Sequence, residues 1–100
     1  MRVKFRIVIY QEGKKLTRED LKDKREPLLI GIRYVLEFKY LEATKWLMLA
    51  EDSYEKYLLL GLINEALGQE AQAREFLEEA SKYPKITPYT IKTEIPKVSS

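Results

Sequence analysis

The sequence predicts a mainly α-helical domain in which a short N-terminal β-strand precedes two antiparallel helical hairpins. Three observations lead to this prediction. A pattern of apolar and small residues recurs after thirty positions within residues 26–84, and such repetition is typical of stacked helical hairpins. Capping residues, glycines and prolines divide that region into four helical segments. The first ten residues alternate between charged and apolar side chains, which is the period of a β-strand.

The strand is expected over residues 2–10, with apolar side chains on one face and basic side chains on the other. The apolar face would hold Val3, Phe5, Ile7 and Ile9, and the basic face Arg2, Lys4 and Arg6. Glu12-Gly13 provides a turn after the strand. Thr17 and Asp20 have the spacing of a capping box, which predicts a short polar helix over residues 18–25.

The four helices of the hairpins are expected at about 27–38, 41–50, 53–68 and 69–83. Pro27 suits a first helical turn, Asp52-Ser53 offers an N-cap for the third helix, and Gly68 suits a left-handed residue at a helix end. The segment after Pro84 favours a strand that either pairs with the N-terminal strand or forms a loose tail. We expect one domain over residues 1–96, divided into 1–16 (basic strand and turn), 17–25 (short helix), 26–53 (first repeat), 54–84 (second repeat) and 85–96 (extended segment), with a disordered tail at 97–100.

The thirty-residue repeat relates small and large residues at equivalent helix positions. The matched pairs are Leu28 with Leu58, Gly31 with Gly61, Ala43 with Ala73, Leu47 with Leu77, and Ala50 with Ala80. A mid-helix glycine costs about 1 kcal/mol relative to alanine, so its repetition indicates a close approach by the partner helix. The alanines would lie against that helix, and the leucines would fill the space between them.

These residues resemble the tetratricopeptide repeat family, which implies a fragment of a right-handed α-α superhelix. The second unit carries Tyr57, Leu60-Gly61, Gly68, Ala73, Ala80 and Pro84 at the family's motif positions, and the first keeps Ile30-Gly31, Tyr34, Ala43 and Ala50. The chain departs from the pattern in three places. Its period is thirty rather than thirty-four, Pro27 replaces an aromatic residue, and Asn64 replaces a tyrosine.

The resemblance implies a non-catalytic protein–protein interaction module, an adaptor or a small subunit of a larger assembly. Its partner groove would be lined by Leu28, Ile32, Val35, Leu58, Leu62 and Glu65. The Lys and Asn residues of a carboxylate clamp are missing, so an apolar helix or strand is the expected ligand. Alternatively, the N-terminal strand, the C-terminal segment or a second subunit covers this face. Because two repeats leave ends to be capped, a homodimer is expected, and VKFRIVIY pairing with its copy is one route to it.

Charge separates along the chain and supports an alternative function. Residues 1–25 carry a net charge of +5, residues 26–83 a net charge of −5, and residues 84–100 a net charge of +2. A small nucleic-acid-associated accessory protein could use the basic N-terminal region through Arg2, Lys4, Arg6, Lys14 and Lys15. Basic residues on a strand face also commonly form a solvated surface or protect a strand edge.

Other function classes find little support in the composition. Cysteine and histidine are absent, which excludes disulfides, thiolate or imidazole catalysis and the common zinc sites. The neighbouring carboxylates Glu51-Asp52 and Glu78-Glu79 do not face each other on a helix, so we expect no enzyme, cofactor or metal. No apolar run is long enough for a membrane span and the N-terminus does not resemble a signal peptide; we expect a cytoplasmic protein. One Asn and three Gln suggest a thermophile.

Overall fold

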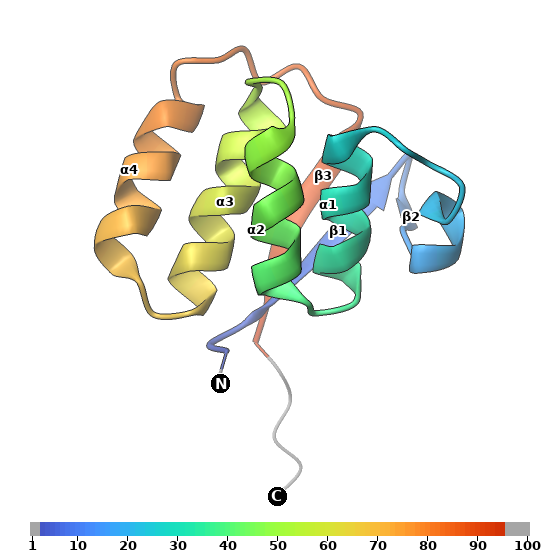
Figure 1. Ribbon diagram of the computed structural model, residues 1–100, viewed down its shortest axis with the longest axis horizontal. Coiled ribbons are helices and arrows are strands. Elements are labelled where there is room, and N and C mark those ends of the chain that lie inside the picture. The colour runs from blue at the N-terminus through green and yellow to red at the C-terminus, as the bar shows by residue number, and fades with distance from the viewer. Residues whose placement is uncertain (1–2, 96–100) are drawn as a thin grey trace, which may run out of the picture.

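The computed structural model describes residues 3–95, and this part of the chain is mainly helical with a small sheet (Figure 1). The predicted N-terminal strand, short helix and four longer helices are present in that order, together with a two-residue strand at Lys14–Lys15 that was not predicted. In chain order the elements are β1 (Arg6–Gln11), β2 (Lys14–Lys15), the 3-10 helix η1 (Arg18–Leu21), α1 (Pro27–Leu36), α2 (Tyr40–Leu49), α3 (Tyr54–Ala66), α4 (Glu70–Ala80) and β3 (Tyr89–Glu94). Arg2 and the tail predicted at 97–100 lie outside the described residues.

The sheet has three antiparallel strands in the order β2-β1-β3. β3 pairs with β1 along its whole length, from Arg6 opposite Glu94 to Gln11 opposite Tyr89. This confirms the first of the two alternatives for the C-terminal segment. β1 is the central strand; β3 pairs with one of its edges along the whole length, whereas on the other edge β2 pairs only with Tyr10 and Gln11.

Two predicted boundaries at the N-terminal end are wrong. The strand begins at Arg6 rather than at residue 2, because the backbone N–H of Lys4 donates to the carbonyl of Ala66 at the end of α3, at 2.8 Å. The short helix is a single 3-10 segment that ends at Leu21, whose side chain is buried. The capping contact that starts this segment is present, since Asp20 Oδ2 accepts a hydrogen bond from the Thr17 N–H at 2.9 Å.

The helix ends follow the expected capping chemistry in most places. Ser53 Oγ accepts a hydrogen bond from the Lys56 N–H at 3.2 Å and caps α3. Gly68 has a φ of +82° after the end of α3, as expected for a left-handed residue at this position. α4 ends at Ala80, three residues before the predicted end, and the chain continues through turns to Tyr83.

The repeated glycines lie where helices approach each other closely. A Cβ atom at Gly31 would be 2.8 Å from Leu47 Cδ2, and a Cβ atom at Gly61 would be 2.6 Å from Leu77 Cδ2. Real Cβ atoms avoid such distances, so each glycine makes room for the leucine sixteen positions further along. The two hairpins therefore share the same internal contact, which explains why both leave a glycine inside a helix.

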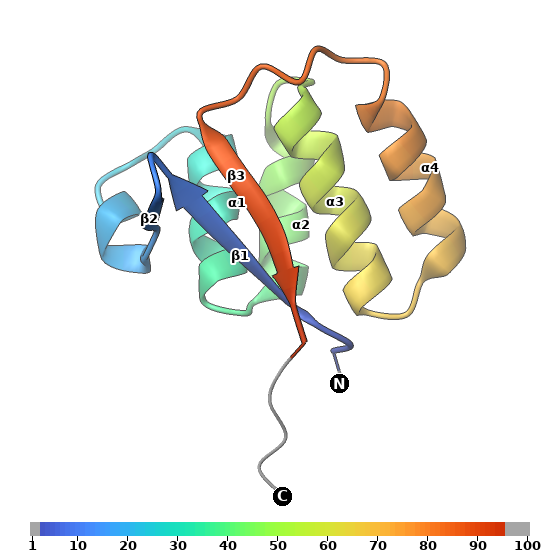
Figure 2. The ribbon, with the colours of Figure 1, turned by 180° about the vertical axis from the view of Figure 1, so that it is seen from behind.

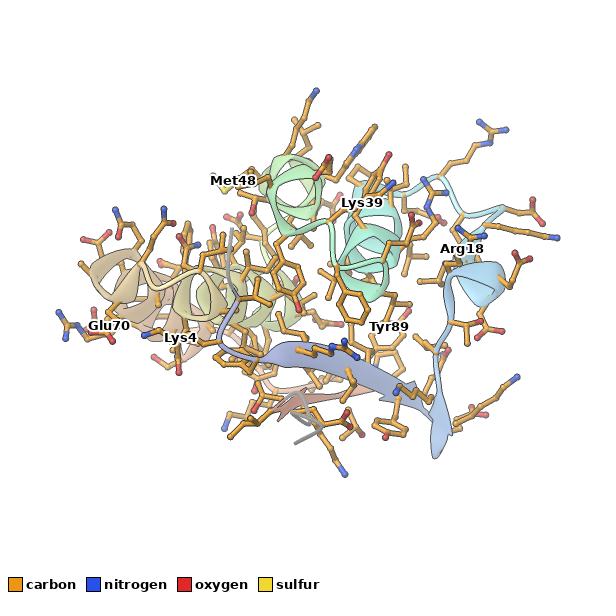
Figure 3. All side chains as sticks on the ribbon, turned by 90° about the horizontal axis from the view of Figure 1, so that it is seen from below. Lys4, Arg18, Lys39, Met48, Glu70 and Tyr89 are labelled. Carbon is orange, nitrogen blue, oxygen red and sulfur yellow. The ribbon has the colours of Figure 1, made fainter. Side chains whose placement is uncertain are left out.

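The sheet packs across one side of the helical layer, over α1 and α3 (Figures 2 and 3). Ile7 and Ile9 point from β1 into the main core, where they meet Ile32 of α1 and Leu59 of α3. The alternation of β1 makes this possible, because its apolar face turns to the helices while Arg6 stays exposed. The core is therefore shared between the sheet and both hairpins.

Candidate functional site

The groove predicted from the sequence is largely occupied by the protein's own sheet. Ile32 and Val35 are 0% exposed and belong to the main core. They are closed to a partner in this conformation, so the predicted groove is covered at these two positions. The remaining predicted residues, Leu28, Leu58, Leu62 and Glu65, are half-buried. Of the coverings considered above, the N-terminal strand packs on α1 and α3, and Tyr89 and Ile91 of the C-terminal strand also pack against the core.

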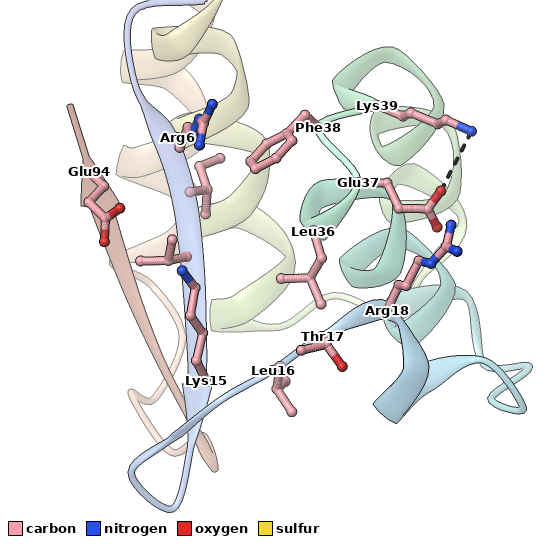
Figure 4. Close-up of a pocket in the computed structure, with 12 residues that line it drawn as sticks. Arg6, Lys15, Leu16, Thr17, Arg18, Leu36, Glu37, Phe38, Lys39 and Glu94 are labelled. Carbon is pink, nitrogen blue, oxygen red and sulfur yellow. Dashed lines mark ion pairs between the residues drawn. The ribbon is translucent and has the colours of Figure 1, made fainter. Parts of the chain in front are cut away.

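The basic residues predicted to contact nucleic acid do not form one surface. Lys4 Nζ lies 3.5 Å from Glu70 Oε1 at the start of α4 (Figure 3). Lys14 Nζ lies 3.9 Å from Asp20 Oδ1. Arg2 lies outside the described residues. Arg6 and Lys15, in contrast, line the same cleft (Figure 4).

This cleft, called the basic cleft below, lies between β1, the β2–η1 connection and the α1–α2 turn (Figure 4). Its volume is about 580 Å³, and it is lined by Arg6, Ile7, Val8, Lys15, Leu16, Thr17, Arg18, Leu36, Glu37, Phe38, Lys39 and Glu94. Four of these side chains are cations and two are carboxylates. The volume is within the range of small-molecule sites, and the formal charge favours an anionic ligand.

Phe38 is the most unusual residue of the basic cleft. It lies in the α1–α2 turn with a φ of +61° and is 50% exposed. A positive φ costs an L-residue about 1–2 kcal/mol, and the thirty-residue repeat places Gly68, with a φ of +82°, at the same position of the second hairpin. The first hairpin therefore tolerates backbone strain where the second uses glycine, and the strained residue holds an aromatic ring at the surface.

Two contacts fix the ring and the strand relative to each other. The Arg6 guanidinium carbon lies 4.8 Å from the centroid of the Phe38 ring, within the range of a cation–π contact. Tyr40, at the start of α2, accepts a hydrogen bond from the Ile7 N–H through its hydroxyl oxygen at 3.1 Å. Burial raises the pKa of the Tyr40 hydroxyl, so it stays neutral near pH 7. These two contacts hold the α1–α2 region against β1.

A second surface lies on the other side of the helical layer, between α2 and α4. A groove of about 710 Å³ is lined there by Met48, Tyr57, Glu75, Phe76, Glu78, Glu79, Ser81 and Lys82. Met48 is 53% exposed, and its neighbours on α2, Leu41 and Leu49, are 61% and 65% exposed. At about 100° per residue these three side chains share one side of α2. We call them the α2 stripe.

A polar cluster at the junction of the two hairpins was not predicted from the sequence. Lys56, which is buried, donates from Nζ to the Ala50 carbonyl at 2.8 Å and to Asp52 Oδ1 at 3.1 Å. The Tyr57 hydroxyl donates to Asp52 Oδ1 at 2.8 Å. The hydrogen bond from Tyr57, followed by that from Lys56, lowers the pKa of Asp52, while Asp52 raises the pKa of Tyr57 to about 12. The Asp52 carboxylate, weighed above as one of a catalytic pair, is thus engaged in holding α2 to α3.

Comparison of the chain with known protein families, characterised proteins and solved structures finds no significant match. Over residues 3–95, no three His, Cys, Asp or Glu side chains come together in a way that could hold a metal ion. None of the helices in that range is long and apolar enough to cross a membrane.

Proposed function

We propose that the protein is a non-catalytic protein–protein interaction module whose two hairpins are tetratricopeptide-like repeats. The repeated contact of Gly31 with Leu47 and of Gly61 with Leu77 supports the repeat assignment. The repeat has a period of thirty residues. One side of the helical layer is covered by the protein's own sheet (Figure 2). The opposite side is therefore the surface left for a partner.

The observation that carries the proposal is the α2 stripe beside the α2–α4 groove. Met48 lines the groove, and Leu41 and Leu49 on the same side of α2 are also more than half exposed, which is typical of an interaction surface. The rim of the groove carries Glu75, Glu78 and Glu79 against Lys82. The occupant is an amphipathic helix of a partner protein, with an apolar face for the stripe and Lys or Arg residues facing the acidic rim.

Paired affinity captures with wild-type and Met48→Glu proteins test this function. A partner should be retained by wild type and lost with Met48→Glu, because the new carboxylate would be desolvated in the interface. Ile86→Glu is the control, since Ile86 is 84% exposed on the α4–β3 connection, outside the groove. A purified partner segment must then bind directly and become helical. Equal loss with both variants would contradict the proposal.

The homodimer stays a prediction, and sedimentation equilibrium over a wide concentration range tests it. If the protein is a dimer and Met48→Glu dissociates it, the second copy binds at the α2 stripe. That surface would then not be available to a different partner. A dimer unaffected by Met48→Glu would leave the α2 stripe free.

A further inference from the structure

The basic cleft presents cations that have no acidic partner of their own. Within residues 3–95, no carboxylate oxygen lies within 4.0 Å of the basic nitrogens of Arg6, Lys15 or Arg18. Lys39, in contrast, lies 3.5 Å from Glu37 (Figure 4). Of these three cations, Arg6 and Lys15 lie along the sheet, whereas Arg18 lies on the helical side beside Glu37 (Figure 4).

The two walls of the basic cleft differ in character (Figure 4). Arg6 and Lys15 lie along the sheet, with Glu94 beside them on β3. Phe38 and Leu36 face them from the helical side. Positive charge on one wall and an exposed aromatic ring on the other match the two parts of a nucleotide, since a phosphate needs cations and a base needs a flat apolar face.

We infer that the basic cleft binds single-stranded nucleic acid, with a phosphate held by Arg6 and Lys15 and an unpaired base stacked on the half-exposed Phe38 ring beside Arg6. The backbone conformation of Phe38 favours this ligand over an acidic peptide. An acidic peptide would require the cations but would give no reason to hold an aromatic ring in a strained turn. A duplex is unsuitable because its bases are already stacked within the helix and cannot reach the ring.

Fluorescence anisotropy with labelled ten-nucleotide oligouridylate and oligothymidylate tests the inference. Binding should weaken with salt, with a slope of log K against log salt of about −1.4, as expected for two phosphate contacts on a single strand at roughly −0.7 each. A duplex of the same length, uridine monophosphate and decaglutamate serve as competitors. If decaglutamate competes as strongly as unlabelled oligonucleotide, the ligand of the cleft is an acidic peptide. That result would overturn the inference. Equal competition by the duplex or by the mononucleotide would also overturn it.

Substitutions at Phe38 separate binding from folding. Phe38→Gly removes the ring but accepts the positive φ without strain, so the fold should be retained while affinity for the oligonucleotide falls about tenfold or more. Phe38→Tyr keeps a stacking ring and should bind within a factor of two or three of wild type. Unchanged affinity of Phe38→Gly would overturn the inference.

Charge substitutions test the phosphate position. Arg6→Gln and Lys15→Gln should each reduce the magnitude of the salt slope by about 0.7, the contribution of one phosphate contact. Glu94→Gln should strengthen binding, since it removes the carboxylate that lies across the strands from Arg6. Lys85→Gln is the control, because Lys85 lies on the α4–β3 connection outside the basic cleft. Equal effects of Lys85→Gln and Lys15→Gln would show a general charge effect and overturn the assignment.

Discussion

The two hairpins share their internal packing but differ in the turns that connect their helices. Gly31 with Leu47 and Gly61 with Leu77 make the same contact inside each hairpin. The turn of the second hairpin uses Gly68 for its positive φ, whereas the turn of the first uses Phe38. The helices thus repeat because both hairpins must pack, whereas the turns differ in surroundings, since the first lines the basic cleft and the second does not. Helix packing therefore constrains the residues inside each hairpin, whereas the turn residues can differ with their surroundings.

The largest expected difference between the hairpins concerns the leucines. Leu47 is fully buried between the hairpins, while Leu77 is half-buried on the terminal helix. Leu47→Ala should therefore lower the free energy of unfolding by about 3–4 kcal/mol, and Leu77→Ala by about 2 kcal/mol. Urea denaturation followed by circular dichroism measures both. Equal losses of unfolding free energy would contradict the expectation that the more deeply buried leucine contributes more to stability.

The junction between the hairpins should be sensitive to Lys56. Lys56→Met keeps the length of the side chain but leaves the Ala50 carbonyl and Asp52 without its ammonium group. Loss of about 2 kcal/mol of unfolding free energy is expected, because a buried acceptor then lacks its donor. Lys82→Met is the matched control, since its ion pair with Glu79 is exposed and should be worth at most about 0.5 kcal/mol. A similarly small loss of unfolding free energy in both variants would show that Lys56 does not stabilise the junction between the hairpins.

The glycine contacts should cost less to disturb. Gly31→Ala and Gly61→Ala each introduce a Cβ atom against a leucine, a penalty of about 1–3 kcal/mol. Better helix propensity offsets about 1 kcal/mol of it, so a net loss of about 1 kcal/mol is expected from each. The double variant Gly61→Ala with Leu77→Ala should lose less than the sum of the single losses, because the new methyl group fills part of the cavity. Strict additivity would show that the two side chains do not meet.

The smallest effect concerns the pH dependence of the Asp52–Tyr57 contact. The pKa of Asp52 is lowered in the folded protein, so its stabilisation is present above its unfolded pKa and is lost as pH falls through the folded value. The pKa of Tyr57 is raised to about 12, so its contribution is present below the unfolded pKa near 10 and is lost as pH rises through 12. Asp52→Asn should bring the pKa of Tyr57 back toward 10 in a titration of tyrosinate absorbance. An unchanged titration would mean that the hydrogen bond does not form in solution.

Local signals in the sequence predicted most of the helical architecture. The cap at Ser53, the left-handed Gly68 and the close contacts at Gly31 and Gly61 follow from residue type and spacing alone, because they depend on neighbours within one hairpin. The sheet over the groove could not be assigned, since β1 and β3 lie at opposite ends of the chain. Their pairing depends on how the hairpins bring those ends together.

The basic cleft was only partly accessible to sequence reasoning for the same reason. Arg6 and Lys15 were identified by charge, but their proximity to Phe38 depends on the turn between α1 and α2 lying against β1. One signal could have identified Phe38. In the thirty-residue alignment it occupies the position of Gly68, which was predicted to be left-handed. An aromatic residue is strained at such a position, so its presence there suggests a function. The buried role of Lys56 had no such signal, because a single lysine on a helix resembles any solvated one.

The divergence of the two turns is tested most directly by Phe38→Gly, measured for both unfolding free energy and oligonucleotide affinity, with Phe38→Ala as its partner variant. Phe38→Gly should be at least as stable as Phe38→Ala, because only glycine relieves the positive φ, and both should lose affinity for oligouridylate about equally. That result would show that the Phe38 ring contributes to binding although its positive φ lowers the stability of the fold. If Phe38→Gly is the less stable variant and binds as tightly as wild type, the ring serves folding alone and the account is wrong.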